Sequence, residues 1–230
     1  MIFDPLYFVF MVPGLLLALW AQARTRGAYN KYSEFRNMQG ITGSQVARTI
    51  LDGNGLYDVR VEEVEGELTD HYDPSQRVLR LSPGVGRIPS VAAMGIAAHE
   101  VGHALQHAQG YAPLRARSAF VPVAQFGSQI GYFALLGGLV LNIMGLAVVG
   151  LVLFAAGAVF ALITLPVEFD ASRRALLALE RGGLVSRSEY GGAKDVLNAA
   201  AWTYVAGFVS SILMVLYFAL QVMGMSRRND

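Results

Sequence analysis

Four long apolar segments divide the chain and predict four helices that cross a membrane. They cover residues 5–23, 120–140, 145–165 and 203–223, and a short turn near residues 141–145 joins the middle two. The stretch 119–165 contains no Lys, Arg, Asp or Glu, and it is long enough for two crossings of about 20 residues each. Buried helices of a soluble protein rarely lack charge over such lengths, so the pattern favours an α-helical integral membrane protein.

The polar residues fall mainly into two blocks, at 24–117 and 166–202. In the first block, residues 44–55 are typical of a helix that ends at a glycine turn. Stretches rich in β-forming residues follow and are separated by turn residues, which predicts a hairpin or a small three-stranded sheet. These stretches are residues 57–64, 66–73 and 77–82.

Basic residues flank the apolar segments mostly on one side. By the positive-inside rule this side is the cytoplasmic one, so both polar blocks are expected in the cytoplasm. Asp4 precedes the first segment where a secretory signal would carry a basic residue, which indicates an uncleaved anchor. The flanking residues on this side are Arg24, Arg26, Lys31, Arg115, Arg117, Arg173 and Arg174, whereas Arg227 and Arg228 fall on the other side.

Composition supports the membrane interpretation and narrows the range of functions. Charged residues make up 15% of the 230 residues and hydrophobic residues 54%, whereas soluble domains are about one quarter charged. The net charge of +1 gives no reason to expect nucleic acid as a partner. The chain has no cysteine, which is compatible with a reducing compartment.

Residues 91–109 are predicted to form a helix, and Ser90 can serve as its N-cap. Three of the four histidines lie in this helix and recur at every fourth position. Residues four apart lie on one face of a helix, so His99 and His103 point the same way. With Glu100 they form H-E-x-x-H, in which two imidazoles bind Zn²⁺ and the glutamate takes a proton from the attacking water. Burying these groups without a metal or partner would be costly, so the sequence predicts a metal site.

A catalytic zinc ion also needs a third protein ligand and one open position. The first carboxylates after the charge-free hairpin are Glu168 and Asp170, and the returning chain can bring them over the histidine helix. We expect Glu168 to be the third ligand, with Asp170 as the alternative. His107 extends the histidine row by one turn, but side chains from three successive turns of one helix cannot easily all reach one tetrahedral ion. His107 is therefore expected to line the cleft or to support the ligands.

Four stretches together resemble a known family. They are "HEVGHALQHAQGYAPLRARS", "LPVEFDASRRAL", "LTDHYDP" and "LNAAAWTYVA". In combination they are similar to the YugP-like membrane zinc metallopeptidases, and the likeness covers nearly the whole chain. More distantly the chain resembles the CAAX prenyl proteases and the HtpX-type quality-control proteases, which share the gluzincin plan.

This resemblance implies zinc ligands at His99, His103 and Glu168, with Glu100 as the general base of a membrane-embedded endopeptidase. One zinc ion per chain is expected. The implied fold has about four transmembrane helices and a small α+β gluzincin-like catalytic part. Relatives in the wider group often carry an aspartate four residues after the glutamate ligand, where it supports a zinc histidine. Here that position is Ser172, so Asp170 or Ser172 is expected to take over this role.

The expected location is the cell membrane, with several passes and a cytoplasmic catalytic part. The partners are a polypeptide substrate, with membrane or misfolded proteins as the expected targets, and the lipid bilayer. The oligomeric state and the natural substrate are left open by the sequence.

The expected organisation of the chain has five parts. They are a transmembrane anchor (1–23), a zincin-like catalytic part with the H-E-x-x-H helix (24–117), a transmembrane hairpin (118–165), a helical segment with the third ligand (166–202), and a transmembrane helix with a tail (203–230).

The residue that stabilises the oxyanion is open among His71, Tyr190, Asn198 and Tyr204. Substrate is expected to lie extended along an edge strand of the small sheet. A non-catalytic metal-binding scaffold or chaperone is the alternative function, but a purely structural site would not need Glu100 as a base. A metal transporter would carry ionisable residues within its spans, and the middle two spans have none.

Overall fold

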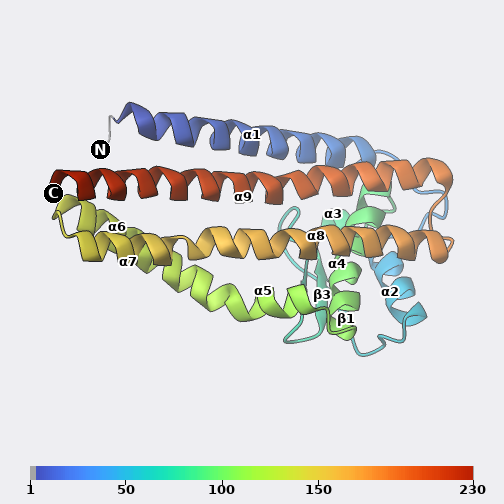
Figure 1. Ribbon diagram of the computed structural model, residues 1–230. Coiled ribbons are helices and arrows are strands. Elements are labelled where there is room, and N and C mark those ends of the chain that lie inside the picture. Colours follow the sequence, from blue (N-terminus) through green and yellow to red (C-terminus); the bar gives the residue numbers. More distant parts are fainter. Residues whose placement is uncertain (1–3, 230) are drawn as a thin grey trace. The chain divides into compact units, whose positions relative to one another are not determined.

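The computed structural model describes residues 4–229 and is mainly helical, with one small sheet (Figure 1). The side chains of residues 226–229 lie outside this description, and with them the predicted flank Arg227 and Arg228. In chain order the elements are α1 (Pro5–Ser33), α2 (Gly43–Gly53), β1 (Arg60–Glu63), β2 (His71–Asp73), β3 (Val78–Leu81), α3 (Pro83–Gly86), α4 (Val91–Ala108), α5 (Ala112–Pro122), a π-helical turn (Val123–Gly127), α6 (Ser128–Val140), α7 (Met144–Phe154), α8 (Ala156–Arg181) and α9 (Arg187–Asn229).

The chain divides into two compact units. The unit without strands, called the helical unit here, consists of Met1–Trp20, Ala116–Leu165 and Thr203–Asp230. The unit with the strands, called the sheet unit, consists of Ala21–Arg115 and Pro166–Trp202. The predicted zinc ligands and Glu100 all belong to the sheet unit.

Within the described residues, four helical stretches are long and apolar enough to cross a membrane. They are Pro5–Ser33, Ala112–Val140, Met144–Arg181 and Arg187–Met225. Each contains one of the four predicted apolar segments, so this part of the prediction is confirmed. The helices run further than the apolar segments do, because good helix formers such as Ala and Arg continue each of them.

The helical unit is held together by close helix contacts. A Cβ atom on Gly138 would lie 2.3 Å from the backbone nitrogen of Ala147, and one on Gly150 would lie 2.2 Å from that of Leu135. These glycines therefore let α6 and α7 pack backbone against backbone. Large apolar side chains face outward, which suits contact with lipid; Phe133, for example, is 66% exposed.

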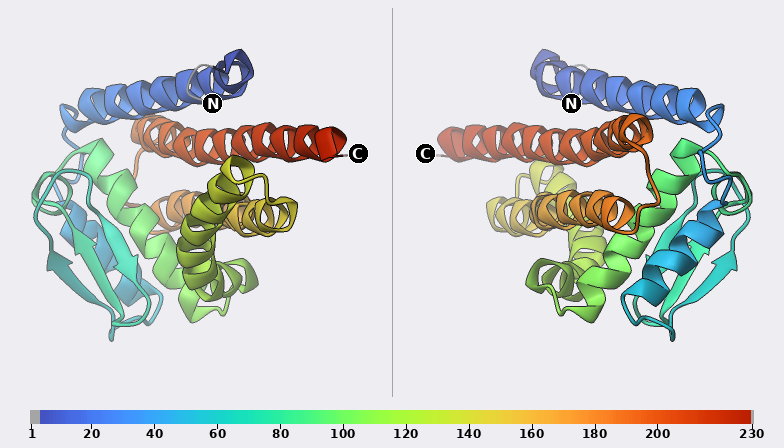
Figure 2. Two further views of the ribbon diagram at one scale, coloured as in Figure 1. Left: turned by 90° about the vertical axis from the view of Figure 1, so that its left-hand side faces the viewer. Right: turned by 90° about the vertical axis from the view of Figure 1, so that its right-hand side faces the viewer.

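The sheet unit is built on a three-stranded sheet with one face covered by α2 and α4 (Figure 2). The strand order is β1-β3-β2; β2 and β3 form an antiparallel hairpin, and β1 runs parallel to β3. The predicted hairpin and small sheet are thereby confirmed. The core under the sheet is apolar and fully buried, and its members include Val46 and Leu51 of α2, Leu79 and Leu81 of β3, and Met94 and Val101 of α4.

Helix α4 is the centre of the sheet unit. Its predicted N-cap is confirmed, because the Ser90 hydroxyl accepts a hydrogen bond from the Ala93 backbone N–H at 3.1 Å. On its other side, a Cβ atom on Gly102 would lie 2.4 Å from the backbone carbonyl oxygen of Ala171 in α8. The glycine therefore brings α8 directly against the histidine-bearing turns of α4.

Candidate metal centre

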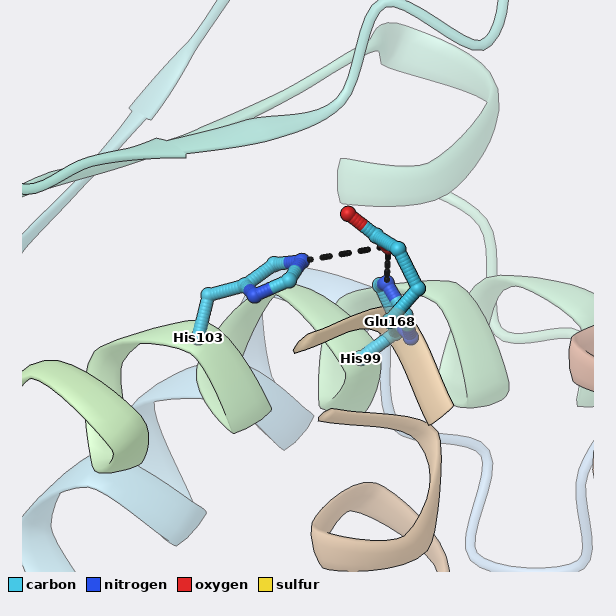
Figure 3. Close-up of side chains that lie close together, drawn as sticks. All are labelled: His99, His103 and Glu168. Carbon is cyan, nitrogen blue, oxygen red and sulfur yellow. Dashed lines mark hydrogen bonds and ion pairs between the residues drawn. The ribbon is translucent and has the colours of Figure 1, made fainter. Parts of the chain in front are cut away.

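The structure brings His99, His103 and Glu168 together (Figure 3). The two histidines lie one turn apart on α4, and their rings meet edge to face with centroids 4.8 Å apart. Glu168 reaches them from α8. Its Oε2 atom lies 3.2 Å from Nε2 of His99 and 3.6 Å from Nε2 of His103. All three side chains are largely buried, with Glu168 only 3% exposed.

These separations fit a tetrahedral zinc ion. Bonds of 2.0–2.2 Å from zinc to nitrogen and oxygen place neighbouring donor atoms about 3.3–3.6 Å apart. The two measured distances from the Glu168 oxygen fall close to this range, and ligand atoms of all three residues lie within 4.8 Å of one another. Two imidazole nitrogens and one carboxylate oxygen are also the donor set of catalytic zinc sites that keep one position open.

Glu100 lies beside this cluster and does not belong to it. Its side chain is buried, with the residue 8% exposed. The charge of Glu100 affects two neighbouring groups, Asp70 and His103. Burial raises the pKa of Asp70, and the nearby charge of Glu100 raises it further. Burial alone lowers the pKa of His103, but the hydrogen bond to Glu168 and the charge of Glu100 outweigh burial, so that this pKa is raised. The Glu100 carboxylate is therefore within electrostatic reach of a predicted ligand.

Each histidine uses its other ring nitrogen for a contact away from the cluster. Nδ1 of His99 lies 3.1 Å from the Ser172 hydroxyl, and Nδ1 of His103 lies 3.0 Å from the Gln106 side-chain oxygen. Such contacts orient metal-binding histidines, and both leave Nε2 directed toward Glu168. Ser172, one of the two residues expected to support a zinc histidine, thus contacts His99 directly.

Asp170 and His107 lie outside the cluster among the described residues. The carboxylate of Asp170 accepts hydrogen bonds from Gln106, Arg173 and Arg174 and does not join the histidine pair. Nδ1 of His107 lies 2.9 Å from the Tyr72 hydroxyl, and both side chains line a cavity of about 240 Å³. His107 therefore lines a cavity at the end of α4.

The four oxyanion candidates lie in different places. His71 is exposed and donates from Nδ1 to the Thr69 carbonyl oxygen at 2.8 Å. Its neighbour on β2, Tyr72, contacts α4, so alternation along the strand puts His71 on the opposite face of the sheet. The other three candidates lie on α9: Tyr190 is half-buried, Asn198 is exposed, and Tyr204 belongs to the helical unit.

Two residues near the site were missed by sequence reasoning. Gln106 is fully buried behind His103, and Asp70 accepts hydrogen bonds from the backbone N–H and hydroxyl of Ser82. A signal for Gln106 was present, because a polar amide one turn after His103 interrupts an apolar helix face. Its contacts depend on residues about sixty positions away, which no local pattern reveals.

Comparison with known proteins identifies the class. Residues 7–223 match the sequence model of the family described as "Putative neutral zinc metallopeptidase", and the chain belongs to this family. The resemblance seen in the sequence motifs is thereby confirmed.

A relative at high identity is the "Putative membrane protease YugP" of Bacillus subtilis (strain 168). It is 45% identical over 214 residues, which are 93% of this chain and 95% of the relative. No solved structure matches the chain.

Proposed function

We propose that this chain is a membrane-embedded zinc endopeptidase. In this proposal His99, His103 and Glu168 hold one zinc ion, and Glu100 is the general base. The observation that carries the proposal is the approach of both Nε2 atoms to one buried Glu168 oxygen, at distances that suit zinc. Membership in a zinc-peptidase family supports the same assignment.

Zinc bound by these residues supplies Lewis acidity, which polarises a peptide carbonyl and makes water more acidic. Glu100 takes a proton from the water whose oxygen bonds to the carbonyl carbon. It then passes this proton to the amide nitrogen as the C–N bond breaks, so that a carboxylic acid and an amine leave. The burial of Glu100 and its place next to His99 on α4 support its assignment as the base.

The proposal extends to fold and location. We infer a gluzincin-like arrangement for the sheet unit, with its H-E-x-x-H helix and its carboxylate from a second helix. The basic flanks of the apolar segments favour a cytoplasmic position for this unit in a multi-pass membrane protein. Membrane proteins or misfolded proteins are the proposed substrates.

The alternative is a scaffold or chaperone that binds the metal only for stability. A structural zinc site is closed by four protein ligands and needs no base. The cluster has three such ligands among the described residues, with a buried glutamate beside it. This arrangement favours the enzyme.

Substitution of the base separates the two functions. In purified protein, Glu100→Gln should retain zinc but lower the hydrolysis of denatured casein by about 100-fold or more, because the proton acceptor is lost. The matched control is Glu65→Gln at an exposed loop position, which should cleave like the wild type. Equal cleavage by Glu100→Gln and the wild type would refute the assignment of the base. Zinc binding without any cleavage by the wild type would favour the scaffold.

A further inference from the structure

Gln106 is a fully buried polar residue that directly contacts a predicted zinc ligand. It lies on α4 three residues after His103, and its exposed fraction is 0%. Its amide nitrogen Nε2 donates to the Val167 carbonyl oxygen at 2.8 Å and to Oδ2 of Asp170 at 3.0 Å. Its oxygen Oε1 lies 3.0 Å from Nδ1 of His103. Both ends of the amide are thus engaged.

The chemistry of these partners permits only one orientation of the amide. A backbone carbonyl oxygen accepts hydrogen bonds and cannot donate them, and the same holds for an ionised carboxylate. Asp170 is held as an acceptor because Arg173 and Arg174 both donate to it. The reversed amide would set its oxygen against two acceptor oxygens in a buried place, which is costly. The NH₂ group therefore faces α8, and Oε1 faces His103.

The orientation of the amide decides the tautomer of His103. Oε1 can only accept, so Nδ1 of His103 must carry the hydrogen that it donates to Gln106. In a neutral imidazole the other nitrogen, Nε2, then keeps its lone pair. This is the nitrogen that lies 3.6 Å from Glu168, in the position of a metal ligand.

His99 lacks an equivalent constraint. Its Nδ1 contacts the Ser172 hydroxyl, and a hydroxyl can donate or accept. Ser172 therefore orients the ring of His99 without fixing its tautomer. The two predicted histidine ligands thus differ in their support.

We propose that Gln106 is a positioning residue that prepares Nε2 of His103 for the metal, and that Asp170 acts through it. The inference rests on the proposed function, because it concerns the support of a ligand in that centre. Gln106 itself touches neither the metal nor the substrate in this scheme. Its effect is expected on metal affinity and on the ligand environment of the metal.

The variant Gln106→Met tests this role, since it keeps the length of the side chain and removes both ends of the amide. The affinity for Zn²⁺, measured in competition with a chromophoric chelator, should fall by about tenfold or more. The visible absorption spectrum of bound Co²⁺ should change as well, because His103 is no longer held in one tautomer. The matched control is Gln109→Met on the next turn, where the amide accepts from Arg174 and does not contact His103. The control should stay within about twofold of the wild type. Wild-type affinity and spectrum in Gln106→Met would overturn the proposal.

A measurement on the wild type keeps the inference testable if Gln106→Met does not fold. With ¹¹³Cd²⁺ in the site and ¹⁵N-labelled histidine, NMR should detect coupling from cadmium to Nε2 of His103 and a proton on its Nδ1. Coordination through Nδ1 would contradict the proposal. Failure of the wild type to bind any of these metals would overturn both this inference and the proposed function. Normal binding and cleavage by Gln106→Met would overturn this inference alone.

Discussion

Glu168 has the most demanding environment among the residues of the centre. A carboxylate that is 3% exposed is costly to bury unless a charge or several hydrogen bonds satisfy it. His99 and His103 both direct Nε2 toward the Glu168 oxygen, and a hydrogen on either nitrogen can bond to that oxygen. In the proposed centre a divalent cation takes the place of these hydrogens and binds all three side chains. The donor set and its distances thus favour a metal in the place where the side chains meet.

At the residue scale, local patterns predicted which side chains lie close together, but not how they are supported. The spacing of His99 and His103 placed both on one helix face, and the first carboxylate after the hairpin pointed to Glu168. The roles of Ser172 and Gln106 depend on how α8 lies on α4, which is set by long-range packing. Sequence alone therefore offered Asp170 and Ser172 as equal candidates for a supporting role.

At the scale of elements, the close contact between α4 and α8 should determine whether the centre forms. Gly102→Ala would drive a Cβ atom into the Ala171 carbonyl oxygen, so the two helices must move apart. We expect a loss of about 1–3 kcal/mol in the free energy of unfolding from this overpacking. Weaker zinc binding should accompany it, because Glu168 lies on the displaced helix. Thermal unfolding and chelator competition in detergent would measure the two effects.

Gly95→Ala on the same helix is the matched control. A Cβ atom there would meet Ala193 at 3.4 Å, which is an ordinary van der Waals contact. Alanine also favours the helix over glycine by about 1 kcal/mol, so this variant should be as stable as the wild type or more stable. Equal stability and zinc affinity in both variants would contradict the role given to Gly102.

Most elements were predictable, because their signals are local. The N-cap Ser90, the hairpin between β2 and β3 and the turn between α6 and α7 all follow from nearby residues. The parallel pairing of β1 with β3 was not foreseen, since it depends on a connection that passes through β2. The length of α1 was underestimated, because a change from apolar to polar residues does not end a helix.

For the whole molecule, the proposed membrane orientation can be tested by labelling. The chain has no cysteine, so single cysteines report without background. Gly27→Cys and Gly145→Cys form a matched pair, because a Cβ atom at either position would meet nothing within 4 Å. In intact cells an impermeant maleimide should label Gly145→Cys, at the start of α7 beside the outer turn of the hairpin, and spare Gly27→Cys, on the basic side. The reverse pattern would place the sheet unit outside the cytoplasm.

The central claim is that His99, His103 and Glu168 together bind one zinc ion. The number of zinc ions per chain tests this claim most directly. Elemental analysis of purified protein, loaded with zinc and freed of excess, should give one ion per chain for the wild type. Glu168→Gln should hold much less zinc, because a neutral amide is a poor substitute for the carboxylate ligand. The control Glu180→Gln, at an exposed position near the end of α8, should hold as much as the wild type. A wild type without zinc, or full occupancy in Glu168→Gln, would contradict the account.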